Sequence, residues 1–326
     1  QGRKSVLFPS PLFFMQRLMR HTLLLLFILL NLVHSACGQG RYSHWISYPT
    51  VDSTSQIWFR HTYVTQTAPE QATITLISTG HFELFVNERN VSNDVMVPYR
   101  PTLSDQPVAI TYDVSRFLRP DSNTIAVWYA PAYPHLNERQ ISLSYYGKME
   151  DGQPFCHVSD GDWLCHWANR SLLPGNNERQ DGQGYSLRWN SNEIDPACWL
   201  SAKEQQGDDR EEILRFSSFY TAEKVSKILQ GLPIPAGQDS VYYNFPATTQ
   251  GWIRVTIRNA KSGERIYIGG LEYICNGKMD EQAYRKFTMA SNQQVLICGD
   301  RHFRKSQIQK VEALEIAPYF HNSYLY

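Results

Sequence analysis

One ten-residue stretch of the 326-residue chain begins with an alternating strand pattern: Phe82-Glu83-Leu84-Phe85-Val86-Asn87-Glu88-Arg89-Asn90-Val91. Phe82, Leu84 and Val86 alternate with other side chains, and a period of two places them on one face of a strand. The stretch therefore predicts a β-strand with one buried face.

The rest of the chain contains further short apolar or alternating runs, separated by proline and polar clusters. We expect strands over 57–64, 72–76, 125–129, 253–257, 264–268, 294–298 and 311–316. One helix is expected over 221–229, where four apolar side chains fall at helical spacing before Gly231 and Pro233. The polar, glycine-rich run 175–184 is expected to be a loop. This pattern predicts an all-β protein.

Composition limits the classes of function. Apolar residues make up 42% and charged residues 19%, which suits a folded, globular chain. Lysine plus arginine and aspartate plus glutamate both number 31, and this balance argues against a nucleic-acid partner. A chain of this length accommodates two domains of ordinary size.

The N-terminal region has the pattern of an export signal. Arg17 and Arg20 precede an apolar run over 23–33, which is too short for a permanent membrane span. The run ends at Ser35-Ala36-Cys37, which predicts lipidation of Cys37, with simple cleavage nearby as the alternative. We assign 1–37 to upstream residues and a signal peptide, and we expect the protein at the cell surface, in the periplasm or outside the cell. A lipid anchor at Cys37 is the only membrane contact expected.

Five cysteines follow Cys37. Export permits disulfides, and Cys156–Cys165 and Cys275–Cys298 are the candidate bridges. Buried free thiols are the alternative, and the pairing stays open at this stage.

Five motifs together resemble a known family. They are the 82–91 hairpin, TYDVSRFLR at 111–119, DSNTIAV at 121–127, SDGDW at 159–163 and the segment from Tyr242 to Trp252. Their order is similar to that in the galactose-binding-like N-terminal accessory domains of bacterial α-L-rhamnosidases, over about residues 40–318. The resemblance implies two jelly-roll or galactose-binding-like β-sandwiches in tandem, at 38–212 and 213–326. The chain departs from the family at two points. The hairpin turn carries Asn87-Glu88 where Asn-Gly would favour a type I′ turn, and the acidic "DCP-x-R-x-E" segment of the catalytic α/α-barrel is not found.

The signal segment, together with this resemblance without a catalytic barrel, leads us to expect an exported, non-catalytic, carbohydrate-associated protein, with rhamnose-containing glycans as the expected partner. One alternative is the N-terminal fragment of a complete α-L-rhamnosidase, and a second is a structural or adhesive surface module. Sugar sites combine aromatic faces with charged or amide groups. The middle of the chain supplies such a set: Trp163, Trp167, Asp181, Tyr185, Arg188 and Trp189. The opposing interpretation is that the tryptophans fill the ends of a sandwich.

Catalytic and metal motifs are weak. The sequence has neither a Gly-x-Ser-x-Gly elbow nor a glycine-rich phosphate loop. The carboxylate pairs Asp160/Asp162 and Asp280/Glu281 fall in turn-like contexts. Calcium is the one ion considered, with oxygens from Asp160, Asp162 and Asp181, and no other cofactor is expected.

Overall fold

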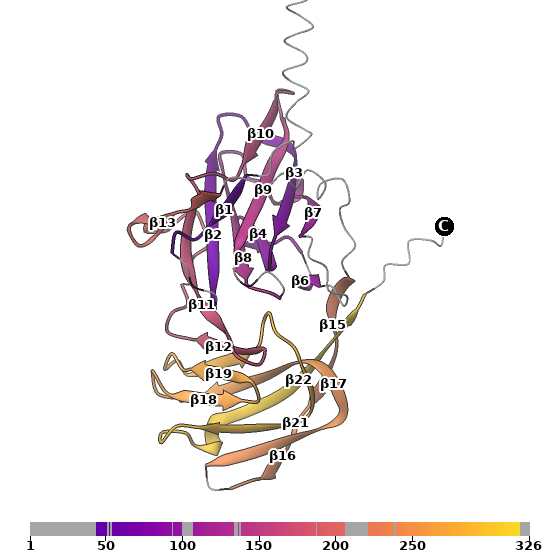
Figure 1. Ribbon diagram of the computed structural model, residues 1–326, viewed down its shortest axis with the longest axis vertical. Coiled ribbons are helices and arrows are strands. Elements are labelled where there is room, and N and C mark those ends of the chain that lie inside the picture. Colours follow the sequence, from indigo (N-terminus) through magenta and orange to yellow (C-terminus); the bar gives the residue numbers. More distant parts are fainter. Residues whose placement is uncertain are drawn as a thin grey trace, which may run out of the picture.

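The structure is a computed structural model that describes residues 44–319, except 51, 53, 93, 100–106, 134–135, 137, 187, 206–220 and 238. The expected signal segment and Cys37 therefore lie outside the described residues, as does the expected boundary at 212/213. The described residues form an all-β structure with short 3-10 turns and contain no α-helix (Figure 1). None of their helical segments is long and apolar enough to cross a membrane.

Residues 45–205 form two facing layers of strands. The strands of one layer are β1 (Trp45–Ser47), β3 (Pro69–Ser78), β7 (Val108–Asp113), β9 (Gln140–Met149), β10 (Pro154–Val158) and β14 (Lys203–Gln205). The strands of the other are β2 (Ser55–Val64), β4 (His81–Val86), β5 (Arg89–Asn90), β6 (Val95–Tyr99), β8 (Ser122–Ala130), β11 (Leu164–Leu173) and β13 (Leu200–Ser201). The first is ordered β14-β1-β9-β3-β7 with β10 on β9, and the second runs β6-β4-β8-β2-β11-β13 with β5 on β4.

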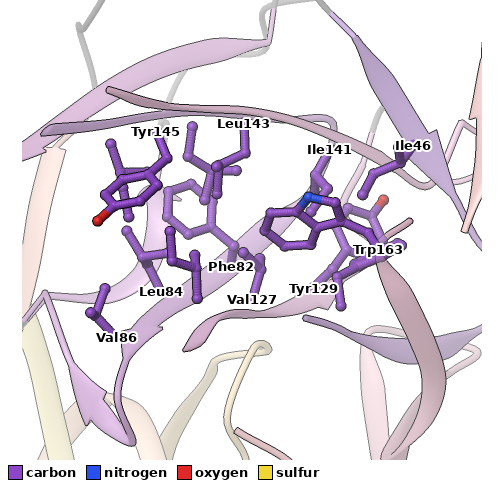
Figure 2. Close-up of a cluster of buried hydrophobic side chains, with 14 of the residues drawn as sticks. Ile46, Phe82, Leu84, Val86, Val127, Tyr129, Ile141, Leu143, Tyr145 and Trp163 are labelled. Carbon is purple, nitrogen blue, oxygen red and sulfur yellow. The ribbon is translucent and has the colours of Figure 1, made fainter. Parts of the chain in front are cut away.

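The core of this unit lies between the two layers. Phe82, Leu84 and Val86 are buried together, as the alternation in the 82–91 stretch predicts. Figure 2 shows them facing Leu143 and Tyr145 of the opposite layer. Burial of large apolar side chains contributes roughly 1.5–3 kcal/mol each, so this cluster is the main source of the unit's stability.

The hairpin turn forms at the expected residues. Asn87 and Glu88 adopt φ angles of 51° and 71°, which is the left-handed region required twice in a type I′ turn. Asn87 holds the turn through its side chain, whose Nδ2 donates to the carbonyl of Phe117 at 2.8 Å and to Asn123 Oδ1 at 2.9 Å. Its Oδ1 accepts from the amide of Thr124 at 3.0 Å. These bonds offset the cost of placing a non-glycine pair in this turn.

Residues 221–318 form a second unit. Its strands are β15 (Thr221–Gln230), β16 (Leu232–Pro235), β17 (Ser240–Arg258), β18 (Arg265–Ile268), β19 (Leu271–Ile274), β20 (Asp280–Tyr284), β21 (Ala290–Gly299) and β22 (Ile308–Pro318). The first part of β17 pairs with β16 and β21, and its last part with β20 and β22. Gly251 lies at this change of partner, where a Cβ would be only 2.0 Å from the carbonyl oxygen of Leu314. A separate apolar core, including Val255 and Ile297, fills this unit.

The predicted helix at 221–229 is wrong, because this segment is β15. It pairs with β22 along most of its length and with β6 at its start. A bulge between Val225 and Lys227 shifts the alternation by one residue, so the apolar side chains fall at helix-like spacing in the sequence. Val225 and Ile228 are 37% and 51% exposed, so they form no buried helical face.

The predicted loop at 175–184 is also wrong in its centre, which forms β12 (Asn177–Asp181). This strand pairs antiparallel with β11 of the first unit and parallel with β19 of the second. Its buried side chains include the polar residues Glu178 and Gln180, which gave the run its loop-like composition. Together with the β6–β15 pairing, β12 links the two units by strand hydrogen bonds at two places.

The two candidate disulfides are absent. Cys165 and Cys275 are free thiols, so neither the 156–165 nor the 275–298 bridge is formed. Burial raises the pKa of the Cys165 thiol to about 12 and that of Cys275 still further, so both are unreactive core residues.

Candidate functional site

Two of the predicted sugar-binding tryptophans lie in the protein interior. Trp163 is 0% exposed and belongs to the core between the two layers of the first unit (Figure 2). Trp189 is 1% exposed and packs on the layer that contains β2, β4 and β8, on the face that points away from that core. Neither ring presents the accessible face that stacking on a sugar requires, so their placement agrees with a structural role for both.

Trp189 is buried because its loop folds back over the sheet. Its ring stacks on Trp58 of β2, with centroids 5.2 Å apart and an interplanar angle of 10°. Phe85 and Trp128 meet it edge-on at 5.2 Å and 5.8 Å. The loop is anchored to the sheet by this four-ring cluster, and the residues on either side of Trp189 are thereby fixed in position.

Trp167 lies apart from this cluster. Alternation along β11 places it on the inner face of the sheet, where it packs against the core. It stacks on Tyr48, with centroids 3.7 Å apart, and the guanidinium carbon of Arg139 is 5.2 Å from its ring. The half-buried ring is therefore already engaged by other parts of the protein.

The polar members of the predicted set have different partners. Asp181 ends β12, where its Oδ1 accepts from the amide of Gln183 at 2.8 Å and fixes the following turn. Arg188 is ion-paired with Glu193, and their side chains are 67% and 76% exposed. Arg188 and Glu193 are thus available at the surface, whereas Asp181 serves the backbone.

Three rings border the buried cluster, and we call them the aromatic edge: Tyr185, which is exposed, and His166 and Trp199, which are half-buried. Tyr185 is 43% exposed and meets Trp58 edge-on at 6.1 Å. His166 lies over the same ring at 6.3 Å and contacts Trp199 at 5.4 Å. Of the predicted site residues, Tyr185 and Arg188 are the two that reach the surface here.

Arg60 lies beneath the aromatic edge and was not predicted. It is 3% exposed, and its guanidinium donates to the carbonyl of Trp189 and to Thr62 Oγ1, both at 3.2 Å. The guanidinium carbon lies 5.7 Å from the Trp199 ring. Burial lowers the pKa of Arg60 to about 10, so the group stays charged at neutral pH. The signal in the sequence was an arginine inside the apolar run 57–64.

The predicted carboxylate pairs have structural partners. Asp160 Oδ1 accepts from the amide of Asp162 at 3.1 Å and closes a turn. Asp280 is paired with Arg258 at 2.7 Å. Glu281 is buried and accepts from Tyr273 Oη at 2.6 Å. These contacts give each pair a role in the fold.

The three aspartates considered for calcium do not meet. Within the described ranges, no group of three or more His, Cys, Asp or Glu side chains is placed to hold a metal ion. Asp160 and Asp162 lie in the turn before β11, and Asp181 ends β12.

Comparison with known proteins finds one family model that matches part of the chain. Residues 67–219 match the model of the α-L-rhamnosidase N-terminal domain. Over 153 residues the chain is 27% identical to an α-L-rhamnosidase from Streptomyces avermitilis, covering 41% of this chain and 14% of that protein.

Solved structures share the fold over most of the chain. The α-L-rhamnosidase from Dictyoglumus thermophilum matches with a TM-score of 0.75 and 18% identity, over 86% of this chain and 36% of that one. The Streptomyces avermitilis enzyme complexed with L-rhamnose matches with a TM-score of 0.69 and 17% identity, over 83% and 29%. The chain thus spans about a third of the length of these enzymes. Over residues 67–219 this chain is therefore similar to the α-L-rhamnosidase N-terminal domain, in agreement with the resemblance of the ordered motifs.

Proposed function

We propose that this chain is a non-catalytic accessory protein that binds carbohydrate at the aromatic edge. The observation that carries the proposal is Tyr185, a ring that is 43% exposed and is supported from behind by Trp58. A ring held in place by another ring loses little freedom when a ligand stacks on it. The aromatic edge therefore offers a rigid apolar surface at the border of a packed cluster.

The surrounding groups suit sugar hydroxyls. Arg188 and Glu193 are exposed in the same loop as Tyr185, and Arg60 adds positive charge beneath Trp199. Aromatic faces stack on the C–H groups of a sugar ring, while charged and amide groups reach its hydroxyls. Since the family acts as α-L-rhamnosidases and one matched enzyme is complexed with L-rhamnose, rhamnose-containing glycans are the proposed ligand class.

The finer description of the fold is part of the proposal. Each unit places its core between facing strands, in support of two jelly-roll or galactose-binding-like sandwiches in tandem. Export and lipidation at Cys37 rest on the sequence pattern. Mass spectrometry of the mature protein tests both. A diacylglyceryl adduct on Cys37 supports lipid anchoring, whereas an unmodified N-terminus beyond Cys37 contradicts anchoring and supports export with simple cleavage.

Titration of the purified chain with rhamnose-containing oligosaccharides tests the binding function. We expect a dissociation constant between about millimolar and tens of micromolar, equivalent to about 4–7 kcal/mol. Tyr185→Ala and Trp199→Ala should each weaken binding. Tyr267→Ala is the matched control, because Tyr267 is 42% exposed but lies on β18 of the second unit. Equal loss in the control variant would contradict the assignment of the site.

A second candidate is the front part of a complete α-L-rhamnosidase. The observation that favours it is that the matched region makes up only 36% and 29% of the two matched enzymes. Two measurements separate the candidates: reading the gene downstream of Tyr326 and assaying the purified chain on aryl rhamnosides. A continuing frame that encodes an α/α-barrel supports the enzyme, and turnover abolished by one carboxylate substitution would contradict a non-catalytic role. A structural or adhesive module with no glycan ligand would show neither turnover nor binding.

A further inference from the structure

A cleft on the second unit lies away from the aromatic edge. Its volume is about 310 Å³, near the lower limit for small-molecule sites. Its lining among the described residues includes Arg258, Lys261, His302, Arg304, Ser306 and Gln307, and contains no carboxylate. The cleft is thus lined by hydrogen-bond donors and positive charge, although the whole chain has a formal net charge of zero.

The walls of the cleft are held by defined contacts. Arg258 ends β17, and the chain then turns at Asn259, which has a φ of 58° and donates its amide to Met279 at 3.0 Å. On the other side, Gln307 is 8% exposed and accepts from the amide of Arg304 at 2.6 Å. Its Nε2 donates to Glu264 at 3.1 Å. Each wall is therefore held by hydrogen bonds within the fold.

The charges on these walls are only partly neutralised. Arg258 donates Nε and Nη2 to Asp280 at 2.7 Å and 3.1 Å. Arg304 donates Nη1 to the carbonyls of Arg301 and Phe303, at 3.1 Å and 2.7 Å, which orients its guanidinium without neutralising it. Within the described part of the chain, neither Arg304 nor Lys261 has an ion-pair partner. Two cations therefore share one cleft without an ion-pair partner among the residues that the structure describes.

We propose that this cleft binds an oxyanion carried on a sugar, namely the carboxylate of a uronic acid. Lys261 and Arg304 supply charge-assisted hydrogen bonds to the oxyanion. Ser306 and Asn259 face the same space and provide partners for ring hydroxyls. The binding of an anion is inferred from the positively charged lining of the cleft alone. Only the choice of a sugar as the carrier of the anion rests on the proposed function.

Calorimetric titration of the full chain tests this site with three probes: trigalacturonate, its fully methyl-esterified form and inorganic sulfate. Esterification removes the charge and keeps the sugar rings. We expect trigalacturonate to bind at least about tenfold more tightly than either other probe, because a lost charge-assisted hydrogen bond costs about tenfold or more. Added salt should weaken this binding by screening the charges.

The double variant Lys261→Gln/Arg304→Gln should weaken trigalacturonate binding by at least about tenfold. Arg89→Gln/Lys227→Gln is the matched control, because it removes the same charge from exposed positions on β5 and β15. Equal binding of the acid and its ester, equal binding of sulfate, or equal loss in both double variants would each overturn the proposal. A loss of neutral-glycan binding in Tyr185→Ala with trigalacturonate binding intact would separate this cleft from the aromatic edge.

Discussion

Arg170 and Glu178 form a fully buried ion pair between neighbouring strands β11 and β12, with Nη1 and Oε1 2.9 Å apart. The Glu178 carboxylate also accepts from the amide of Lys286 at 3.0 Å and from Thr288 Oγ1 at 3.1 Å. Arg170 donates in addition to the carbonyl of Tyr284 at 2.7 Å. One ion pair of the first unit thereby fixes the 284–288 segment of the second.

Replacing Glu178 by Gln should lower the free energy of unfolding by about 3–5 kcal/mol, because the charge of Arg170 would remain buried without its partner. Arg188→Ala is the control: it breaks the exposed pair with Glu193 and should cost below about 1 kcal/mol. Chemical denaturation of both variants measures the difference. Similar costs for the two would show that the buried pair does not join the units.

Replacing a buried ring by alanine should lower the free energy of unfolding more than replacing an exposed ring. Trp163→Ala and Trp189→Ala should each cost about 3–5 kcal/mol, because each leaves a cavity where a fully buried ring was. Tyr185→Ala should have a much smaller effect, since 43% of that residue is already exposed. Thermal melting checks this order, and an early melt for Tyr185→Ala alone would contradict the assigned burial.

The hairpin turn offers a stabilising substitution. Glu88 has a φ of 71°, which glycine adopts without the steric cost of a Cβ. Glu88→Gly should therefore raise the free energy of unfolding by about 0.4–1 kcal/mol. Gln71→Gly, at an exposed and paired position in the extended strand β3, should lower it by roughly 0.5–1 kcal/mol. Denaturant midpoints show whether each variant is more or less stable than the wild type. Destabilisation by both substitutions would contradict the left-handed conformation of Glu88.

His81 should make stability depend on pH. Burial lowers its pKa to about 4, whereas an unfolded histidine titrates near about 6.5. Between these values the unfolded chain binds a proton that the folded chain does not, so stability should fall as the pH drops from about 6.5 to 4. The contribution of this one group is roughly 3 kcal/mol.

His81→Gln should remove that part of the pH dependence. The pKa of His157 is also lowered, first by burial and then by His61, so His157 adds a slope of the same sign. Unfolding curves at several pH values for each single variant and the double variant apportion the effect. An unchanged slope in His81→Gln would show that this histidine is accessible to protons in the folded state.

Much of the fold was predictable because the alternation of buried and exposed side chains along a strand can be recognised within a short stretch of sequence. The alternation in 72–76, 82–86 and 253–257 gave strands that the structure contains. The predictions were wrong where contacts between residues far apart in the sequence determine the local structure. Glu178 and Gln180 gave β12 a loop-like composition, yet both are buried by partners about a hundred residues away.

The candidate site was predictable only in part. Composition drew attention to Tyr185 and Arg188, which lie at the surface, but gave the same weight to Trp163 and Trp189. The distinction depends on whether the chain around each ring packs against a sheet, and the Trp189 loop does so by stacking on Trp58. Arg60 was missed because one charged residue within an apolar run leaves the strand pattern unchanged.

The most direct test of the glycan-binding proposal is a titration of three proteins with the same rhamnose-containing oligosaccharide: wild type, Tyr185→Ala and Tyr267→Ala. NMR chemical shifts of the tyrosine and tryptophan ring protons report both binding and the retention of the fold. The account predicts saturable binding by wild type and Tyr267→Ala, and its loss in a folded Tyr185→Ala. Absence of binding by the wild-type protein, or equal binding by Tyr185→Ala, would contradict it.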